Sequence, residues 1–155
     1  MTDRVLQDFP ARVSASFEGY DGPNEYDLSG KQDWAGAVRD TMRRVRAVQQ
    51  RTAFRPFVVY GPSVTSAAAY ATLGDLSLWF DRATMHNYLA GRNPGVAGWG
   101  DAGYGSIAWN LAQVRKFGGT KPIVTTETGY RSSRLNSAMR AHTSWSSTSP
   151  GSMRI

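Results

Sequence analysis

The sequence predicts a parallel α/β fold, because short β-rich runs alternate along the chain with longer segments of helical spacing. The β-rich runs are followed by glycine, proline and asparagine residues, which is typical of strands that end in turns. Hydrophobic residues make up 41% and charged residues 19% of the 155 residues, the composition of a packed globular chain. We therefore expect one domain with one hydrophobic core.

Four runs are expected to form strands. Residues 12–17 alternate between polar and apolar side chains and lead into a turn-rich segment. Residues 56–60 are a continuous apolar run closed by a Gly-Pro pair, as is typical of a strand buried on both faces. A short third strand is expected at 83–86, and a fourth at 122–126, just before a Glu-Thr-Gly sequence.

Three segments are expected to form helices. Residues 34–48 carry an apolar stripe, preceded by Ser29 and Gln32 as a possible capping box. Residues 104–114 carry a second stripe, which a Gly-Gly pair and a proline bring to an end. A shorter helix is expected within 64–73. The two stripes consist of Trp34, Val38, Met42, Val45 and Val48, and of Tyr104, Ile107, Ala108, Leu111 and Val114.

The positive charge is unevenly distributed. The formal net charge is +6, but residues 131–155 hold four arginines, eight serines and no acidic residue, so the remainder has 14 basic against 12 acidic residues. We expect this Ser/Arg-rich tail to be disordered or frame-shifted, and residues 1–130 to form the folded part. The basic face of the 34–48 helix, with Asp40 and Arg44 paired at i,i+4, indicates a solvated surface. A nucleic-acid partner is the less favoured alternative for that face, and we expect none.

Several classes of protein are disfavoured by what the sequence lacks. It has no cysteine, and its only imidazoles are His86 and His142, so we expect neither a metal site nor a cofactor. No run approaches the ~18 apolar residues of a membrane span, and no membrane partner is expected. The first residues lack the basic start and apolar stretch of a signal peptide, which leaves the localisation open because a longer relative could be secreted.

Polar residues gather where the expected strands end. Glu25 follows the first strand, His86 and Tyr88 lie at the end of the third, and Glu127 follows the fourth. In a parallel α/β architecture these ends share one edge, where active sites are built. A single loop glutamate is usually only a surface residue, but two at matched strand ends indicate a carboxylate pair. Glu18 is a second acid candidate near the first strand.

Three motifs in this order resemble a known family. Asn24-Glu25, then His86-x-Tyr88, then the segment 121–129 with Thr-Thr-Glu-Thr-Gly are similar to the clan A retaining glycoside hydrolases. The likeness covers about residues 10–130 and is nearest to bacterial putative glycosyl hydrolases. It implies a partial (β/α)₈ barrel of about four parallel strands, equivalent to strands four to seven.

The resemblance also implies roles for individual residues. Glu25 would be the general acid/base and Glu127 the nucleophile of a double displacement that cleaves O-glycosidic bonds in a carbohydrate substrate. Asn24 would bind the sugar 2-hydroxyl, while His86 and Tyr88 would support the nucleophile Glu127. Retaining hydrolysis needs one protonated and one ionised carboxyl group, so the chemistry of the pair agrees with these roles.

Further expectations concern the aromatic rim and the missing strands. Trp99, in a Gly-Trp-Gly loop after the third strand, is expected to stack on sugar rings, although helix packing is an equal alternative. Tyr26 stands where many relatives have proline, and nothing in the sequence matches strands one to three or eight. We therefore expect a fragment of a glycosidase with little activity alone, which self-associates through open sheet edges. The alternative is a non-catalytic barrel remnant that serves as a carbohydrate-binding or structural module.

Overall fold

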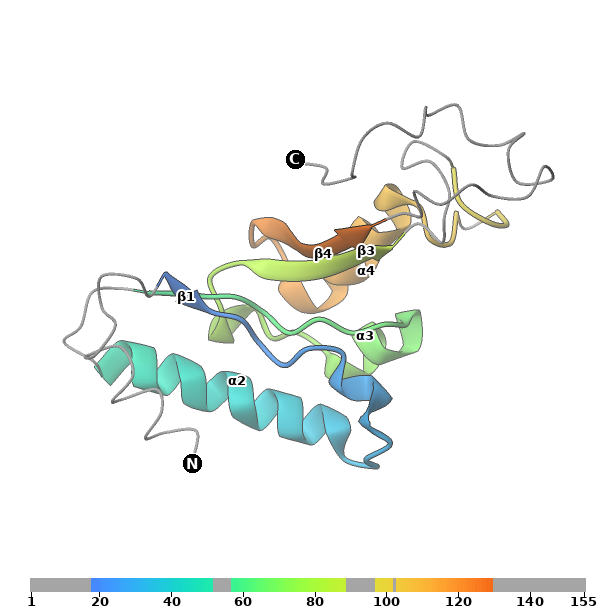
Figure 1. Ribbon diagram of the computed structural model, residues 1–155. Helices are drawn as coiled ribbons and strands as arrows, with labels where there is room; N and C mark the ends of the chain where they lie inside the picture. Colours follow the sequence, from blue (N-terminus) through green and yellow to red (C-terminus); the bar gives the residue numbers. More distant parts are fainter. Residues whose placement is uncertain (1–17, 52–56, 89–96, 102, 130–155) are drawn as a thin grey trace.

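The fold was analysed in a computed structural model, which describes residues 18–51, 57–88, 97–101 and 103–129 (Figure 1). The strand expected at 12–17 and the tail expected after 130 lie outside these residues. None of the helices in the described part of the chain is both long enough and apolar enough to cross a membrane.

Strands and helices alternate along the described chain, which confirms the mixed α/β class. Figure 1 shows α2 running along the β1 side of the molecule, with α4 behind β3 and β4. In chain order the elements are β1 (Gly19–Tyr20), η1 (Tyr26–Ser29), α2 (Trp34–Arg51), β2 (Val58–Val59), α3 (Ala67–Leu73), η2 (Ser77–Trp79), β3 (Ala83–Tyr88), α4 (Ile107–Gly118) and β4 (Ile123–Gly129).

The strands form two parallel pairs, β1 with β2 and β3 with β4, and not one four-stranded sheet. Among the described residues, one parallel bridge, between Tyr60 and Arg82, joins the two pairs. The residues just before β3 lie beside the end of β2 at this bridge. There the carbonyl of Val59 accepts hydrogen bonds from the N–H groups of both Asp81 (2.7 Å) and Arg82 (3.3 Å).

β4 contains one residue more than the part of β3 that it pairs with. Met85 lies opposite Thr125, but the next residue of β3, His86, lies opposite Glu127, so Thr126 has no place in the register. Such a bulge moves a side chain relative to its neighbours on the adjacent strand. Paired residues of parallel strands face the same side of the sheet, and Glu127 therefore shares the face of His86.

The core lies between the strands and the helices that cover them. Val38, Met42 and Val45 of α2 are at most 1% exposed, as the apolar stripe predicts. From the other side, the Phe117 ring of α4 stacks on Tyr70 of α3, with ring centroids 5.6 Å apart. Burying a side chain of this size contributes about 1.5–3 kcal/mol.

Two details of the helix predictions are wrong. α2 is capped by Asp33, whose Oδ1 accepts the N–H of Gly36 at 3.2 Å, and not by Ser29. α4 begins only at Ile107, with Ser106 as its N-cap, so the exposed Tyr104 precedes the helix. The buried face of α4 is also partly polar: it comprises Asn110, Gln113, Val114, Phe117 and Gly118.

Candidate functional site

Four of the predicted site residues meet at the carboxyl ends of the strands. Glu25 lies in the loop after β1, His86 and Tyr88 lie in the last half of β3, and Glu127 lies near the end of β4. All four strands run in the same direction, so their carboxyl ends face one edge of the molecule. We call these four residues the strand-end cluster.

His86 lies between the two glutamates of the strand-end cluster. Its Nδ1 is 2.8 Å from Oε1 of Glu25, and its Nε2 is 3.6 Å from Oε1 of Glu127. The imidazole side chain is only 5% exposed, whereas the Glu25 and Glu127 side chains are 30% and 40% exposed. The glutamates can therefore be reached from solvent, while the histidine that links them is held inside.

The two carboxylates are close enough to act on one small group. One oxygen of Glu25 and one of Glu127 lie within 4.8 Å of each other. The hydroxyl of Tyr88 donates a hydrogen bond of 3.0 Å to Oε2 of Glu127. This hydrogen bond raises the pKa of Tyr88 above its ordinary value of 10.0, because it favours the protonated phenol. Tyr88 thus ties the end of β3 to the carboxyl group of Glu127.

The proton between Glu25 and His86 can belong to either group. If Glu25 is ionised, the Nδ1–H of His86 donates to it, and if Glu25 is protonated, its hydroxyl donates to a bare Nδ1. Both arrangements keep the 2.8 Å contact. Glu25 is therefore a carboxyl group with a proton donor and acceptor permanently beside it.

Asp21 is a further acidic residue near the strand-end cluster that the sequence analysis did not select. Although the residue is exposed, partial burial of its carboxyl group raises its pKa above 3.8. The charge of His86 opposes this rise and the charge of Glu127 adds to it, which places Asp21 within their electrostatic reach. Its position directly after β1 was the available signal.

The other two predicted site residues lie outside these contacts. Asn24 is exposed and forms a parallel backbone bridge with Ser63, and no hydrogen bond of its side chain to the strand-end cluster is found among the described residues. Trp99 is 45% exposed on the connection from β3 to α4, where it forms an antiparallel bridge with Tyr104. Their ring centroids are 6.2 Å apart.

Glu25, His86 and Glu127 can each offer one ligand atom to a shared metal ion, since these atoms lie within 4.8 Å of one another. An ion between Glu25 and His86 would have to replace their direct 2.8 Å contact. The residues as arranged bind each other, and the expectation of no metal stays a prediction.

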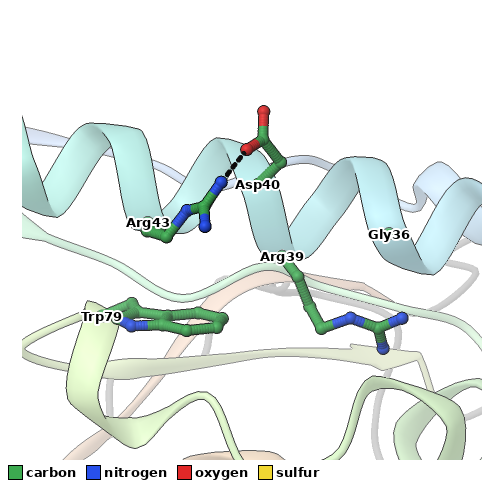
Figure 2. Close-up of a pocket in the computed structure, with 5 residues that line it drawn as sticks. All are labelled: Gly36, Arg39, Asp40, Arg43 and Trp79. Carbon is green, nitrogen blue, oxygen red and sulfur yellow. Dashed lines mark hydrogen bonds and ion pairs between the residues drawn. The ribbon is translucent and has the colours of Figure 1, made fainter.

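A separate hollow of about 290 Å³ lies between α2 and η2. Figure 2 shows Trp79 on one side of this hollow, with Arg39 extending from the helix and Arg43 turned toward Asp40. Both arginines have structural partners: Arg43 pairs with Asp40 at 2.6 Å, and Arg39 donates to the carbonyl of Thr72 at 3.0 Å. The hollow includes no residue of the strand-end cluster.

Fold and site together define a mixed α/β protein with a carboxylate–imidazole–carboxylate cluster at the ends of parallel strands. No protein-family model, curated protein or solved structure matches the chain. What the strand-end cluster can do therefore follows from its geometry.

Proposed function

We propose that the strand-end cluster belongs to a retaining glycoside hydrolase. The observation that carries this proposal is the pair of carboxylates, Glu25 and Glu127, with oxygens within 4.8 Å of each other. Retaining glycosidases need carboxyl groups about 5–5.5 Å apart, whereas inverting enzymes need about 6.5–9.5 Å to admit a water molecule. The separation favours a nucleophilic carboxylate over one that only activates water.

The different partners of the two glutamates support different roles. Glu127 accepts the hydrogen bond of Tyr88 and attacks the anomeric carbon as a carboxylate, forming a glycosyl ester. As the bond to the leaving oxygen breaks, Glu25 transfers its proton to that oxygen. Glu25 then takes a proton from water, which attacks the anomeric carbon and releases Glu127. His86 exchanges the proton with Glu25 and orients it.

The finer fold assignment is also a proposal. We place the four strands as strands four to seven of a (β/α)₈ barrel, supported by their common direction and by the bridge between Tyr60 and Arg82 that joins the two pairs. In that arrangement Asn24 binds the sugar 2-hydroxyl and Trp99 stacks on a sugar ring, as the family resemblance implies. Both residues are exposed at the carboxyl-end loops.

The test compares substitutions on aryl glycosides with good and poor leaving groups. In a barrel completed with the missing strands, Glu127→Ala should abolish turnover of both, while Glu25→Ala should spare substrates with good leaving groups, which need no protonation. Added azide should restore turnover in the Glu25 variant and give a product of retained anomeric configuration. It should not give a retained product in the Glu127 variant. Glu18→Ala is the matched control, because Glu18 is an exposed glutamate near the same strand and should leave turnover unchanged.

Activity that survives Glu127→Ala, or an equal loss on both substrate types in both variants, would contradict these roles. Inversion of the anomeric configuration, followed by NMR, would contradict the retaining mechanism. Binding of oligosaccharides without any hydrolysis would instead support the carbohydrate-binding module.

One observation supports self-association, which is expected of both candidates. Within the described ranges, β1 and β4 each pair with a single strand, so each leaves one edge without a strand partner. Open edges of this kind pair with other chains. A non-catalytic or structural module that self-associates should show a concentration-dependent mass in sedimentation experiments, with or without intact glutamates.

A further inference from the structure

We propose that Asp27 is a positioning residue for Glu25, and that it acts through Thr65 without touching the reacting atoms. The inference rests on the proposed function only for its effect on catalysis, because the contact it controls, between Glu25 and His86, can be observed without a substrate.

Two loops at the carboxyl ends of β1 and β2 are joined by four hydrogen bonds. Ser63 provides the backbone bonds: its N–H donates to the carbonyl of Pro23 at 3.2 Å, and its carbonyl accepts the N–H of Glu25 at 2.9 Å. Oδ2 of Asp27 then accepts two bonds from Thr65, from the N–H at 3.1 Å and from Oγ1 at 2.6 Å. The bonds of Pro23 and Asp27 therefore fix the chain two residues before and two residues after Glu25.

Glu25 needs such support because of its backbone conformation. At φ 43° and ψ 39° it lies in the left-handed region, and it is the one described residue other than glycine with a positive φ. This region is unfavourable for a residue with a Cβ and persists only when the surrounding structure imposes it. The carbonyl of Glu25 accepts the N–H of Leu28 at 3.0 Å, so the same conformation starts η1, the turn that carries Asp27.

The environment of Asp27 is not one that stability alone would select. Its other oxygen, Oδ1, is buried and has no hydrogen-bond partner among the described residues. Burying part of a carboxylate without a partner is unfavourable. Burial, followed by the charges of Asp27 and Glu25, raises the pKa of Tyr70 to about 12, which places both carboxylates near one phenol. Asp27 is thus held near Glu25 with one of its carboxylate oxygens unpartnered among the described residues.

The first test follows the proton shared by Glu25 and His86 with NMR. The chain has two histidines, so His142→Gln leaves only the ring of His86 to assign. We expect a downfield signal from the proton shared by Glu25 and Nδ1 of His86, and a matching Nδ1 nitrogen shift, in the unsubstituted site, and the loss of both in Asp27→Ala. Asp27→Asn should retain them, because an amide oxygen can accept both bonds from Thr65.

Asp33→Ala is the matched control, since it also removes an aspartate oxygen that accepts a backbone N–H, but at the start of α2. It should leave the His86 signals unchanged. If Asp27→Ala does not fold, Thr65→Val removes only the hydroxyl bond, and the His86 signals should then broaden or shift. Unchanged His86 signals in a folded Asp27→Ala variant would overturn the proposal. If only Thr65→Val folds, unchanged His86 signals in Thr65→Val would overturn it.

The second test measures catalysis. Asp27→Ala should reduce kcat for a poor leaving group at least about 10-fold more than for a good one, with KM little changed, because general acid catalysis supplies about 10²–10⁴-fold and only the poor leaving group needs it. Asp27→Asn should restore the parent ratio. An equal loss on both substrates would show a purely structural role. The NMR result decides the role of Asp27 whether or not the protein hydrolyses these substrates, so the proposed function and this inference fail separately.

Discussion

Asp81, which pairs with Arg46 of α2, is predicted to contribute far more to stability than Asp40. Asp40 lies on α2 and pairs with Arg43 and Arg44. Oδ1 of Asp81 binds Nη1 of Arg46 at 2.8 Å, and its Oδ2 accepts the backbone N–H of Val59 at 2.9 Å. Gln49 donates a third bond, of 3.0 Å, to Oδ2. Asp81 therefore links α2, β2 and the start of β3 at the only bridge between the two parallel pairs in the described chain.

The expected loss on Asp81→Ala is about 3 kcal/mol. Val59 is fully buried, so its N–H would lose its acceptor in a place that water reaches poorly, at about 1–3 kcal/mol. The side chain of Arg46 is 15% exposed and would lose a charge-assisted bond of about 1.5–3 kcal/mol, part of which it recovers by turning toward water. Asp40→Ala is the control: its partners Arg43 and Arg44 are more than half exposed, and ion pairs exposed in this way contribute little to stability.

Urea unfolding of the full chain, followed by circular dichroism, measures both variants. Burial alone would raise the pKa of Asp81, but the hydrogen bonds from Val59, Gln49 and Arg46 outweigh it and lower the pKa below 3.8. A lowered pKa means that the charge of Asp81 stabilises the fold above the ordinary pKa and that this stabilisation is lost as the pH falls through the folded value. The difference between the parent and Asp81→Asn should therefore shrink below pH ~4. Equal losses for Asp81→Ala and Asp40→Ala would refute the reasoning.

Two other predictions use the same protein. Phe117→Ala should lower the free energy of unfolding by about 3–5 kcal/mol, because Phe117 is fully buried against Tyr70. Leu78→Ala, at a side chain that is 83% exposed, should change the free energy of unfolding little, and similar losses for both variants would contradict the assigned core. Tyr88 should ionise above pH 10.0, which can be followed as the phenolate absorbance that is missing from Tyr88→Phe. Glu127→Gln should move this ionisation down toward pH 10.0, and an unchanged ionisation would contradict the hydrogen bond between Tyr88 and Glu127.

The elements predicted best are those whose pattern is set by burial alone. The stripe of α2 follows the helical period, and Val38, Met42 and Val45 are buried as predicted. The stripe of α4 was misjudged because Asn110 takes a core position, where its side-chain amide donates to Asn87 on β3 at 2.9 Å. A polar residue that is satisfied by another buried polar residue leaves no trace in a hydrophobic pattern.

The site was predictable in its membership but not in its connections. Strand-end positions indicated Glu25, His86 and Glu127, yet the place of Glu127 opposite His86 depends on the extra residue of β4 at Thr126. The solvated face predicted for α2 is also only partly right, because Arg46 reaches Asp81, 35 residues along the chain. Contacts of this range are set by tertiary packing, which residue spacing does not encode.

The extra residue in β4 bears on how the chain tolerates insertions and deletions. Without the bulge, Thr126 would lie opposite His86, and Glu127 would lie opposite Asn87, whose side chain faces α4. Deleting Thr126 would remove the bulge and still leave Glu127 opposite His86, whereas inserting a residue after Thr126 would require a wider bulge or a reversal of faces. Length changes at this position are therefore asymmetric: the strand can lose one residue and keep its carboxylate on the cluster side, but it cannot simply gain one.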